Sequence, residues 1–294
     1  MKKSILWPFN PQNELYSMAK LAKLPHGAIT FLALLGVIFL SLIPAGIIVL
    51  IIRVAGMDVP NLVSSFLQFI SFILAVWLYI SVVEKRSFKS LGFFGLRRFK
   101  KYIGGFLIGV SLLTASFVIV SLMTKANVEF SFSFGISSIV SIITVLIFFI
   151  IQGASEEIVF RGWLMQSIGI RHWPWLGIAL STLLFAILHA ANPNFNLIAG
   201  LNIFLVGLLL AILALYDGSL WGVCGFHTAW NFTMNSVYGI NVSGTKLVGD
   251  TLLKTTFEGS PLITGGGFGL EGSLVVSALI VALMVVILFL KRKG

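Results

Sequence analysis

Charged residues are scarce in this chain, and their scarcity sets its class. Only 10% of the 294 residues are Asp, Glu, Lys or Arg, whereas 58% are hydrophobic. Soluble domains carry roughly 25% charged residues. The composition therefore excludes a soluble enzyme or binding module and indicates an integral membrane protein. A helical membrane bundle of this length usually forms one compact unit.

Cysteine is almost absent. The single copy, Cys224, excludes an intrachain disulfide and a metal site with several thiolate ligands. Because Cys224 stands three residues before His227, it is either part of a thiolate–imidazole dyad or a small buried side chain, and we favour the second. The first apolar stretch is interrupted at Pro8 and is too short for a signal-peptide core, so we expect it to be retained.

Acidic residues are outnumbered by basic ones, 10 to 20, which gives a net charge of +10. Such an excess can indicate nucleic-acid binding, but here the basic residues flank the apolar segments and no nucleic-acid-binding motif accompanies them. In that position they set the orientation in the membrane and meet anionic lipid headgroups. We expect the lipid bilayer as a partner and no nucleic acid. The sequence makes no prediction of the oligomeric state.

Long apolar runs are abundant. A helix needs about 20 mainly apolar residues to cross the hydrocarbon layer, and the sequence predicts an all-α bundle of about eight transmembrane helices. Pro44 should kink the first of them. The fourth is too long for a straight crossing, so we expect it to be tilted, extended beyond the membrane or broken near Gly153. The predicted segments are 28–52, 62–83, 103–123, 136–168, 174–191, 197–216, 219–238 and 271–290.

The distribution of Lys and Arg predicts the orientation. Fifteen basic residues fall on one side of the predicted bundle and four on the other. Basic loops stay in the cytoplasm, so both termini are predicted to be cytoplasmic. The chain then divides into an interfacial segment (1–27), a transmembrane domain (28–290, with its motif core at 136–238) and a basic tail (291–294).

We make a separate structural prediction for each of three segments outside the predicted crossings. Residues 5–26 are predicted to form an interfacial helix on the inner leaflet. Residues 84–101 interleave aromatic and basic side chains, and we expect them on the same surface. Residues 239–270 form a long outer loop with a glycine-rich end. This loop lacks the Lys-Ser/Thr of a phosphate-binding loop, and we interpret it as a flexible hairpin or lid.

Ionisable residues within a crossing are costly and mark functional sites by default. The fourth segment contains three, in the stretch "EEIVFR". Residues four apart share a helix face, so Glu157 and Arg161 are predicted to form an ion pair that supports the segment. Glu156 points about 100° away, as follows from 3.6 residues per turn. We predict no partner for it within its own segment, which leaves it available for chemistry.

Two later segments carry polar groups at the same spacing. Phe185 and His189 share one helix face, and so do His227 and Asn231. At a rise of about 1.5 Å per residue, Glu156 and both histidines fall in one layer near the middle of the membrane. We therefore predict that Glu156, His189, His227 and Asn231 meet in one cavity. The alternative for each histidine is a hydrogen-bonded core side chain.

A carboxylate, two imidazoles and a carboxamide suit two kinds of chemistry. In the first, Glu156 activates a water molecule while His and Asn groups stabilise the oxyanion. In the second, Glu156, His189 and His227 bind a zinc-type ion that assists hydrolysis. The H-E-x-x-H motif is absent, so such a metal site would be assembled from separate helices. The residues leave both mechanisms open.

The same residues occur in the same order in a known family. The chain contains Glu-Glu-x-x-x-Arg in "EEIVFR", Phe-x-x-x-His in "FAILH" and His-x-x-x-Asn in "HTAWN". With these motifs it resembles the CAAX protease and bacteriocin-processing (CPBP, or Abi) family of intramembrane endopeptidases, over roughly residues 85–290. No motif position departs from the family pattern.

The resemblance implies a role for each motif residue. Glu156 would activate the water together with His189, and His227 with Asn231 would stabilise the oxyanion. Glu157 and Arg161 would support the site, with Phe185 beside His189. The family has been described both as metalloproteases and as metal-independent glutamate proteases. The resemblance therefore implies either no cofactor or zinc.

The function expected from the motif residues and from this resemblance is intramembrane peptide hydrolysis, and the resemblance implies the cell membrane of a bacterium as its location. The substrate would be a membrane-associated or lipidated peptide or protein, such as a bacteriocin precursor. One alternative is a non-catalytic scaffold or bacteriocin-immunity protein that modulates a partner such as a sensor kinase. Another is a proton-coupled transporter, against which the lack of an internal repeat counts.

Overall fold

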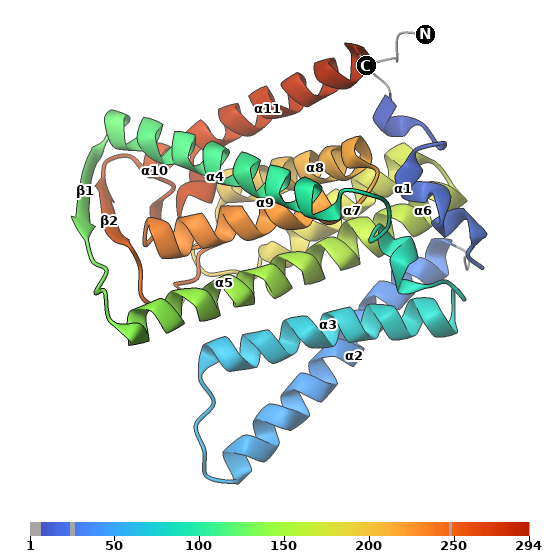
Figure 1. Cartoon of the computed structure of the whole chain (residues 1–294), viewed down its shortest axis with the longest axis horizontal. Coiled ribbons are helices and arrows are strands. Elements are labelled where there is room, and N and C mark those ends of the chain that lie inside the picture. The colour runs from blue at the N-terminus through green and yellow to red at the C-terminus, as the bar shows by residue number, and fades with distance from the viewer. Residues whose placement is uncertain (1–6, 24–26, 247–248, 294) are drawn as a thin grey trace.

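The computed structural model describes residues 7–23, 27–246 and 249–293 of the chain. It is built almost entirely of helices, with a single two-stranded sheet among the described residues (Figure 1). This confirms the predicted all-helical membrane fold. The main helices are α2 (Gly27–Val54), α3 (Asn61–Val82), α4 (Arg98–Met123), α5 (Ile136–Glu157), α6 (Met165–Arg171), α7 (Pro174–His189), α8 (Leu197–Asp217), α9 (Trp221–Phe232) and α11 (Leu274–Lys293).

Each predicted apolar segment contains one of these helices, but the helices differ in length. Within the described ranges, five stretches are long and apolar enough to cross a membrane. Two shorter apolar helices, Pro174–His189 and Leu274–Leu290, accompany them. The five long stretches are Leu32–Val54, Asn61–Val82, Arg98–Met123, Ile136–Arg171 and Leu197–Asp217.

The long fourth segment is not broken at Gly153, so that alternative was wrong. Helix α5 runs through Gly153 and passes after Glu157 into a π-helical stretch, Ile158–Leu164, followed by α6. Single π-helical turns interrupt α-helices frequently at functional sites. Gly153 has a packing role instead, because a Cβ at this position would lie 3.3 Å from the Cβ of His227.

Helix α9 lies at the centre of the bundle and is buried along nearly its whole length. Glycines of α4 allow it to pack closely. A Cβ on Gly105 would overlap the backbone of Gly222, and one on Gly109 would overlap the carbonyl of Phe226. Small residues at helix interfaces let backbones approach closely in membrane proteins. This packing holds the third motif in place.

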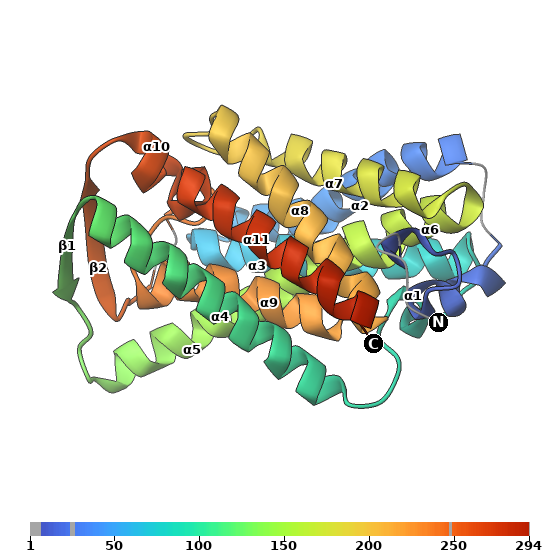
Figure 2. The ribbon, with the colours of Figure 1, turned by 90° about the horizontal axis from the view of Figure 1, so that it is seen from above.

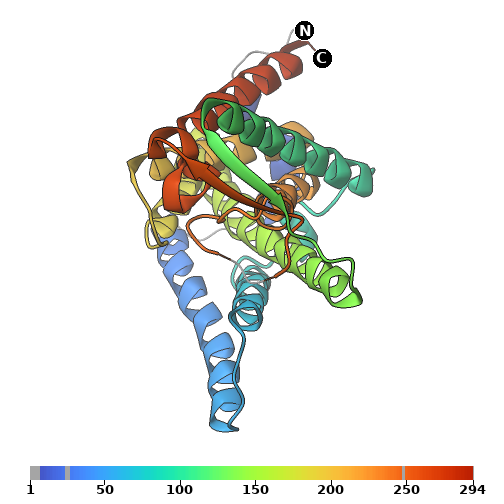
Figure 3. The ribbon, with the colours of Figure 1, turned by 90° about the vertical axis from the view of Figure 1, so that its left-hand side faces the viewer.

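Helices α2 and α3 form a pair that projects from one side of the bundle (Figure 3). Phe39 of α2 is 70% exposed and Leu32 64% exposed. Apolar side chains in this setting face lipid rather than water. Near the bundle, α3 packs against α5, and Phe69 meets the ring of Phe148 at 5.8 Å.

The N-terminal segment is not the single interfacial helix that was predicted. Residues 7–23 form three short turns: Trp7–Phe9, α1 (Glu14–Ser17) and Ala19–Leu21. Residues 1–6 and 24–26 lie outside the described part of the chain. Prolines at positions 8 and 11 prevent a continuous helix. Leu15 and Tyr16 are fully buried in the protein rather than in lipid, and burial raises the pKa of Tyr16 far above its ordinary value.

The loop after α3 was predicted to lie on the membrane surface, and its first part does not. Glu84 and Arg86 are buried and form an ion pair at 2.6 Å. Glu84 Oε1 also accepts hydrogen bonds from Trp163 Nε1 (2.9 Å) and Ser167 Oγ (3.1 Å). Burial lowers the pKa of Arg86, and the neighbouring Glu84 carboxylate opposes this shift. The ion pair ties the loop to the π-helical stretch and to α6.

The segment expected to be a flexible hairpin or lid contains regular structure. Strand β2 (Leu253–Glu258) pairs antiparallel with β1 (Lys125–Phe130), with Lys125 opposite Glu258 and Phe130 opposite Leu253. The short helix α10 (Pro261–Thr264) and two 3₁₀ turns follow. The glycine-rich turns surround Phe268, which is fully buried. The described part of the segment is thus a folded cap, and its buried side chains join the hydrophobic core of the bundle.

The segments that connect the helices gather at two opposite ends of the bundle (Figures 1 and 2). The sheet end comprises residues 53–60, 124–135, 190–196, 238–246 and 249–273, with β1, β2 and α10. The basic end comprises residues 7–23, 83–101, 171–173 and 217–220, together with the last turn of α11. The helix directions place the motif residues between these ends.

Candidate active site

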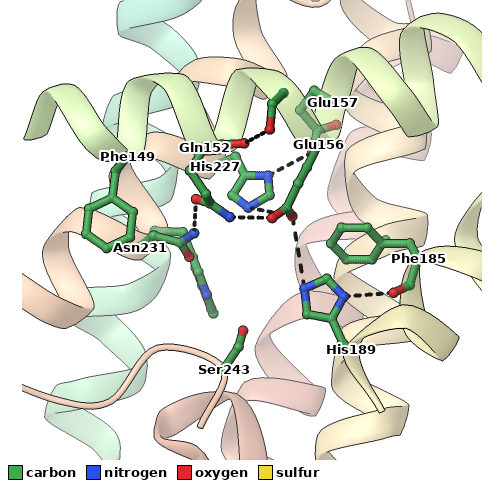
Figure 4. Close-up of polar contacts among 12 residues, drawn as sticks. Phe149, Gln152, Glu156, Glu157, Phe185, His189, His227, Asn231 and Ser243 are labelled. Atoms are coloured by element: carbon green, nitrogen blue, oxygen red, sulfur yellow. Dashed lines mark hydrogen bonds and ion pairs between the residues drawn. The ribbon is translucent and has the colours of Figure 1, made fainter. Parts of the chain in front are cut away.

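Three helices bring the motif residues to one cavity (Figure 4). Glu156 lies in the last turn of α5, His189 is the last residue of α7, and His227 and Asn231 lie one turn apart on α9. The cavity has a volume of about 440 Å³, and all four side chains line it. Their roles in catalysis remain a prediction at this point.

Glu157 has two partners on the protein side of the cavity. Its Oε1 accepts hydrogen bonds from Arg161 Nη1 at 2.9 Å and from His227 Nδ1 at 2.8 Å. Arg161 Nη2 donates to the carbonyl of Gly207 at 2.9 Å, and the guanidinium lies 4.6 Å from the ring centre of Phe185. Glu157 and Arg161 are fully buried. The ion pair expected from the spacing is present, whereas the contact with His227 was not foreseen.

The bond to Glu157 sets the tautomer of His227. A carboxylate only accepts hydrogen bonds, so Nδ1 of His227 carries the proton and Nε2 faces the cavity. Nε2 lies 3.6 Å from Glu156 Oε2. The two neighbouring glutamates therefore contact opposite nitrogens of one imidazole. Glu157 orients the ring, and Glu156 meets its cavity-facing edge.

His189 is oriented in the same manner by a backbone group. Its Nδ1 donates to the carbonyl oxygen of Phe185 at 2.8 Å, and its ring lies 4.4 Å from the ring centre of Phe185. Nε2 of His189 then faces Glu156 Oε2 at 4.0 Å. Two imidazole Nε2 atoms thus converge on one carboxylate oxygen.

Glu156 does have a partner within its own segment, contrary to the prediction. Gln152, one helical turn earlier, donates from Nε2 to Glu156 Oε1 at 2.5 Å. Gln152 Oε1 in turn accepts a hydrogen bond from Asn231 Nδ2 at 2.8 Å. Gln152 therefore links Glu156 to the third motif. Its spacing of four residues from Glu156 is the signal that could have revealed it.

The second oxygen of Glu156 is buried and accepts no hydrogen bond from the described residues. Its distances to the two Nε2 atoms exceed the 2.7–3.2 Å of a direct N–H···O hydrogen bond. Separations of this size suit a bridging water or another small polar group. Glu156 Oε2, His189 Nε2 and His227 Nε2 are therefore placed to hold one such group between them.

The zinc alternative receives no support from the arrangement of these donors. Among the described residues, no group of three or more His, Cys, Asp or Glu side chains has the geometry to hold a metal ion. Cys224 is buried, as the second of its two interpretations requires.

A second carboxylate lines the cavity near the sheet end, and sequence analysis missed it. Glu271 is buried and accepts hydrogen bonds from Trp230 Nε1 (3.0 Å), Ser243 N (2.7 Å) and Ser243 Oγ (2.9 Å). Ser243 has a φ of 46°, which is unusual for a residue with a side chain. Glu271 thus fastens the loop around Ser243 to the cavity. Only the folded cap brings these residues, far apart in the chain, together.

The rest of the cavity wall is apolar and largely aromatic. Helices α2 and α3 contribute one side of it, and α8 contributes the opposite side. Such a wall suits apolar portions of a substrate, with the few polar groups fixing its position. The principal apolar residues are Ile38, Phe69, Phe72, Phe148, Phe149, Phe160, Ile203, Val206 and Leu210.

Comparison with models of protein families gives a match. The sequence model of a family described as "Type II CAAX prenyl endopeptidase Rce1-like" matches residues 137–233, about a third of the chain. A search of curated proteins finds no match. The matched segment contains the three motifs and the helices α5, α7, α8 and α9. The match confirms the resemblance to the CAAX protease family.

Proposed function

We propose that this multi-pass membrane protein, whose residues 137–233 match the type II CAAX prenyl endopeptidases, hydrolyses a peptide bond within the membrane. One observation carries the proposal most directly. The carboxylate oxygen Oε2 of Glu156 faces two oriented imidazole nitrogens, at 3.6 and 4.0 Å, in a cavity whose wall is largely apolar. A site of this kind can bind and deprotonate a water molecule next to a substrate.

The first step of the proposed mechanism is the attack of water. A water held between Glu156 Oε2 and His189 Nε2 loses a proton to Glu156 as its oxygen adds to the carbonyl carbon of the scissile bond. Positioned general bases contribute about 10²–10⁴-fold to such reactions. The weakly polar surroundings strengthen each electrostatic interaction relative to water. Glu156 is the base because none of the residues that the structure describes donates a hydrogen bond to its Oε2.

The oxyanion that forms needs hydrogen-bond donors. Asn231 Nδ2 uses one hydrogen to bond Gln152, at 2.8 Å, and its second hydrogen is available to the oxyanion. His227 can donate from Nε2 when the ring carries both protons. Glu157, at 2.8 Å from Nδ1, balances the charge of that form. Preorganised donors of this type contribute several kcal/mol to acyl transfer.

The second step is the collapse of the tetrahedral intermediate. The carbon–nitrogen bond breaks, and protonated Glu156 returns its proton to the leaving nitrogen. The products are a carboxylic acid and an amine, and Glu156 is regenerated. In this scheme Gln152, Glu157 and Phe185 only position groups that react, since each contacts a reacting side chain and lies outside the immediate path of the proton. Arg161 acts through Glu157, to which it donates a hydrogen bond.

The wider organisation is part of the same proposal. Eight helices would cross the cytoplasmic membrane of a bacterium, with both termini in the cytoplasm. Residues 1–27 would form the N-terminal segment, 28–290 the protease domain and 291–294 the basic tail. The substrate would be a membrane-associated peptide or protein, lipidated or not. The apolar cavity wall supports this class of substrate.

The test is cleavage by the purified protein in proteoliposomes. Internally quenched peptides are supplied in two matched sets, one with a farnesylated cysteine near the C-terminus and one without a lipid. We expect wild type to cleave one set and Glu156→Gln to lose about 10²–10⁴-fold in rate, the contribution of a general base. Metal content is measured on the same samples.

Three outcomes would contradict the proposal or its mechanism. Cleavage that persists in Glu156→Gln at the wild-type rate would remove Glu156 as the base. A cellular phenotype that is identical in wild type and Glu156→Gln, without any cleavage, would favour the non-catalytic scaffold. Activity that disappears with chelation and returns with zinc would replace the water mechanism by a metal-assisted one.

A further inference from the structure

The cavity extends from the motif residues to the sheet end of the bundle. His189 is the last residue of α7, 15 residues after Pro174 at the basic end. At about 1.5 Å per residue this places it roughly 22 Å from the basic end. Asn192, in the loop after α7, lines the cavity together with Ser243 and Thr245 of the cap. The rim of the cavity therefore belongs to the sheet end.

The path from Glu156 toward the basic end is filled by protein. Arg161, Trp163 and Leu164 follow Glu156 along the same helix, and each is fully buried. Leu220, at the start of α9, is also fully buried. Densely packed side chains of this kind do not admit a peptide. Among the described residues, polar access to the site therefore lies on the sheet side.

The two ends differ sharply in charge. The described residues of the basic end include thirteen Lys and Arg against three acidic residues. The sheet end has four basic residues (Arg53, Lys125, Lys246 and Lys254) against five acidic ones, Glu271 among them. Basic residues near the ends of crossings are retained in the cytoplasm. By this rule the basic end faces the cytoplasm and the sheet end faces the other side.

We infer that the cavity opens on the extracytoplasmic side and that its substrate is a peptide presented there. The inference rests on the proposed peptidase function and adds the side of access and the source of the substrate. A peptide made in the cytoplasm reaches this rim only after export across the membrane. The reaction that supplies the substrate is therefore a translocation step, and the products are released outside the cytoplasm.

The chemistry of the rim fits an extended peptide chain. Asn192, Ser243 and Thr245 provide hydrogen-bonding groups along one side, while Phe69 and Phe72 of α3 provide an apolar surface on the other. Glu271 holds Ser243 through both its backbone N–H and its hydroxyl. The polar groups would bind the peptide backbone, and the aromatic wall would take apolar side chains next to the scissile bond.

The side of access is tested by labelling of introduced cysteines in the full-length protein. Thr245→Cys places an exposed thiol on the rim, and Lys89→Cys places an exposed thiol at the basic end. Wild type is the control, because its Cys224 is buried. With a membrane-impermeant maleimide we expect Thr245→Cys to react in right-side-out vesicles and Lys89→Cys only in inverted ones. Reaction of Thr245→Cys in inverted vesicles alone, or of both variants on the same side, would overturn the inference.

A second measurement separates this inference from the proposed function. Peptide cleavage is assayed in detergent and in sealed vesicles of both orientations, with the unlipidated quenched peptides outside. If the protein cleaves the peptides in detergent, and right-side-out vesicles cleave them while inverted vesicles do not, both the peptidase function and the side of access are supported. If only inverted vesicles cleave, the side of access is wrong while the peptidase function stands. If detergent samples do not cleave, the proposed function fails, and the labelling result still decides which side the rim faces.

Discussion

Two buried polar clusters of similar size each include side chains of the long segment Ile136–Arg171, at neighbouring stretches of it, and they differ in how fully their polar groups are hydrogen-bonded. The loop cluster near the basic end ties the segment after α3 to the bundle. Its glutamate accepts three hydrogen bonds, and its arginine donates from all three nitrogens. The members of this cluster are Glu84, Arg86, Trp163, Gln166 and Ser167.

The site cluster lines the cavity and leaves several polar atoms without a hydrogen bond. Oε2 of Glu156, Oε2 of Glu157 and Nε of Arg161 are all buried in this state among the described residues. Buried polar groups are nearly always hydrogen-bonded, so such exceptions mark places with a further task. A cluster whose polar groups are all hydrogen-bonded stabilises the fold, whereas a cluster with unbonded polar atoms can bind a water molecule or a substrate group. The members of this cluster are Gln152, Glu156, Glu157, Arg161 and His227.

The largest effects are expected from removing one arginine of each cluster. Arg161→Met and Arg86→Met each leave a buried carboxylate without its counter-charge, which costs about 3–5 kcal/mol. Chemical unfolding in micelles should show a similar loss for both. Peptide cleavage per folded molecule should be lost in Arg161→Met and kept in Arg86→Met. Equal loss of cleavage in the two variants would remove the functional difference between the clusters.

A smaller and more specific effect is expected from matched Glu→Gln substitutions. Glu157→Gln keeps a hydrogen-bond acceptor for His227 but removes the charge that balances the ring and Arg161. We expect kcat/KM to fall about 10- to 100-fold, as for other residues that orient a reacting histidine. Glu84→Gln should lower stability and leave kcat/KM unchanged. A normal kcat/KM for Glu157→Gln would show that its contact with His227 has no catalytic consequence.

Glutamine substitutions separate the clusters further. Gln152→Leu removes the hydrogen bond to Glu156 and the link to Asn231, and a hydrogen bond to a charged group contributes about 1.5–3 kcal/mol. We expect kcat to fall about 10-fold with little change in KM, because the orientation of the base is lost rather than substrate contacts. Gln166→Leu is the matched control and should affect stability alone. A change in KM only would place Gln152 among the substrate-binding groups.

The smallest effect is expected at Tyr16, which packs near the loop cluster. Its hydroxyl is buried without a hydrogen bond among the described residues, and burial alone raises its pKa. Tyr16→Phe removes a polar group that has no partner, so the free energy of unfolding should stay unchanged or rise by less than about 1 kcal/mol. A clear loss of stability would reveal a partner for this hydroxyl. If stability is unchanged, the unbonded hydroxyl of Tyr16 has no task, unlike the unbonded atoms of the site cluster.

The helical periodicity predicted local relations well. Spacing of four residues placed Glu157 beside Arg161 and Phe185 beside His189, and both contacts are present. The same rule applied to Gln152 and Glu156 would have found their hydrogen bond. It was overlooked because an uncharged glutamine in an apolar segment does not stand out by composition.

Predictions for the connecting segments failed for a different reason. The charges of residues 84–86 and the glycines after residue 260 resemble those of exposed loops, and periodicity carries no signal there. Glu84 and Arg86 are buried because Trp163 and Ser167 of a distant helix provide partners. Strand β1 exists because β2 lies beside it, more than a hundred residues later in the chain. Such long-range partners are invisible in a local pattern.

By itself, the sequence determined the membrane class, the apolar helices and the identity of the motif residues, because these depend on composition and on spacing along one helix. Only the tertiary structure decided which nitrogen of each histidine faces Glu156, since that depends on Glu157 and on the carbonyl of Phe185. It also decided that the rim of the cavity lies at the sheet end. Orientation and access are properties of several helices packed together, and no single segment carries them.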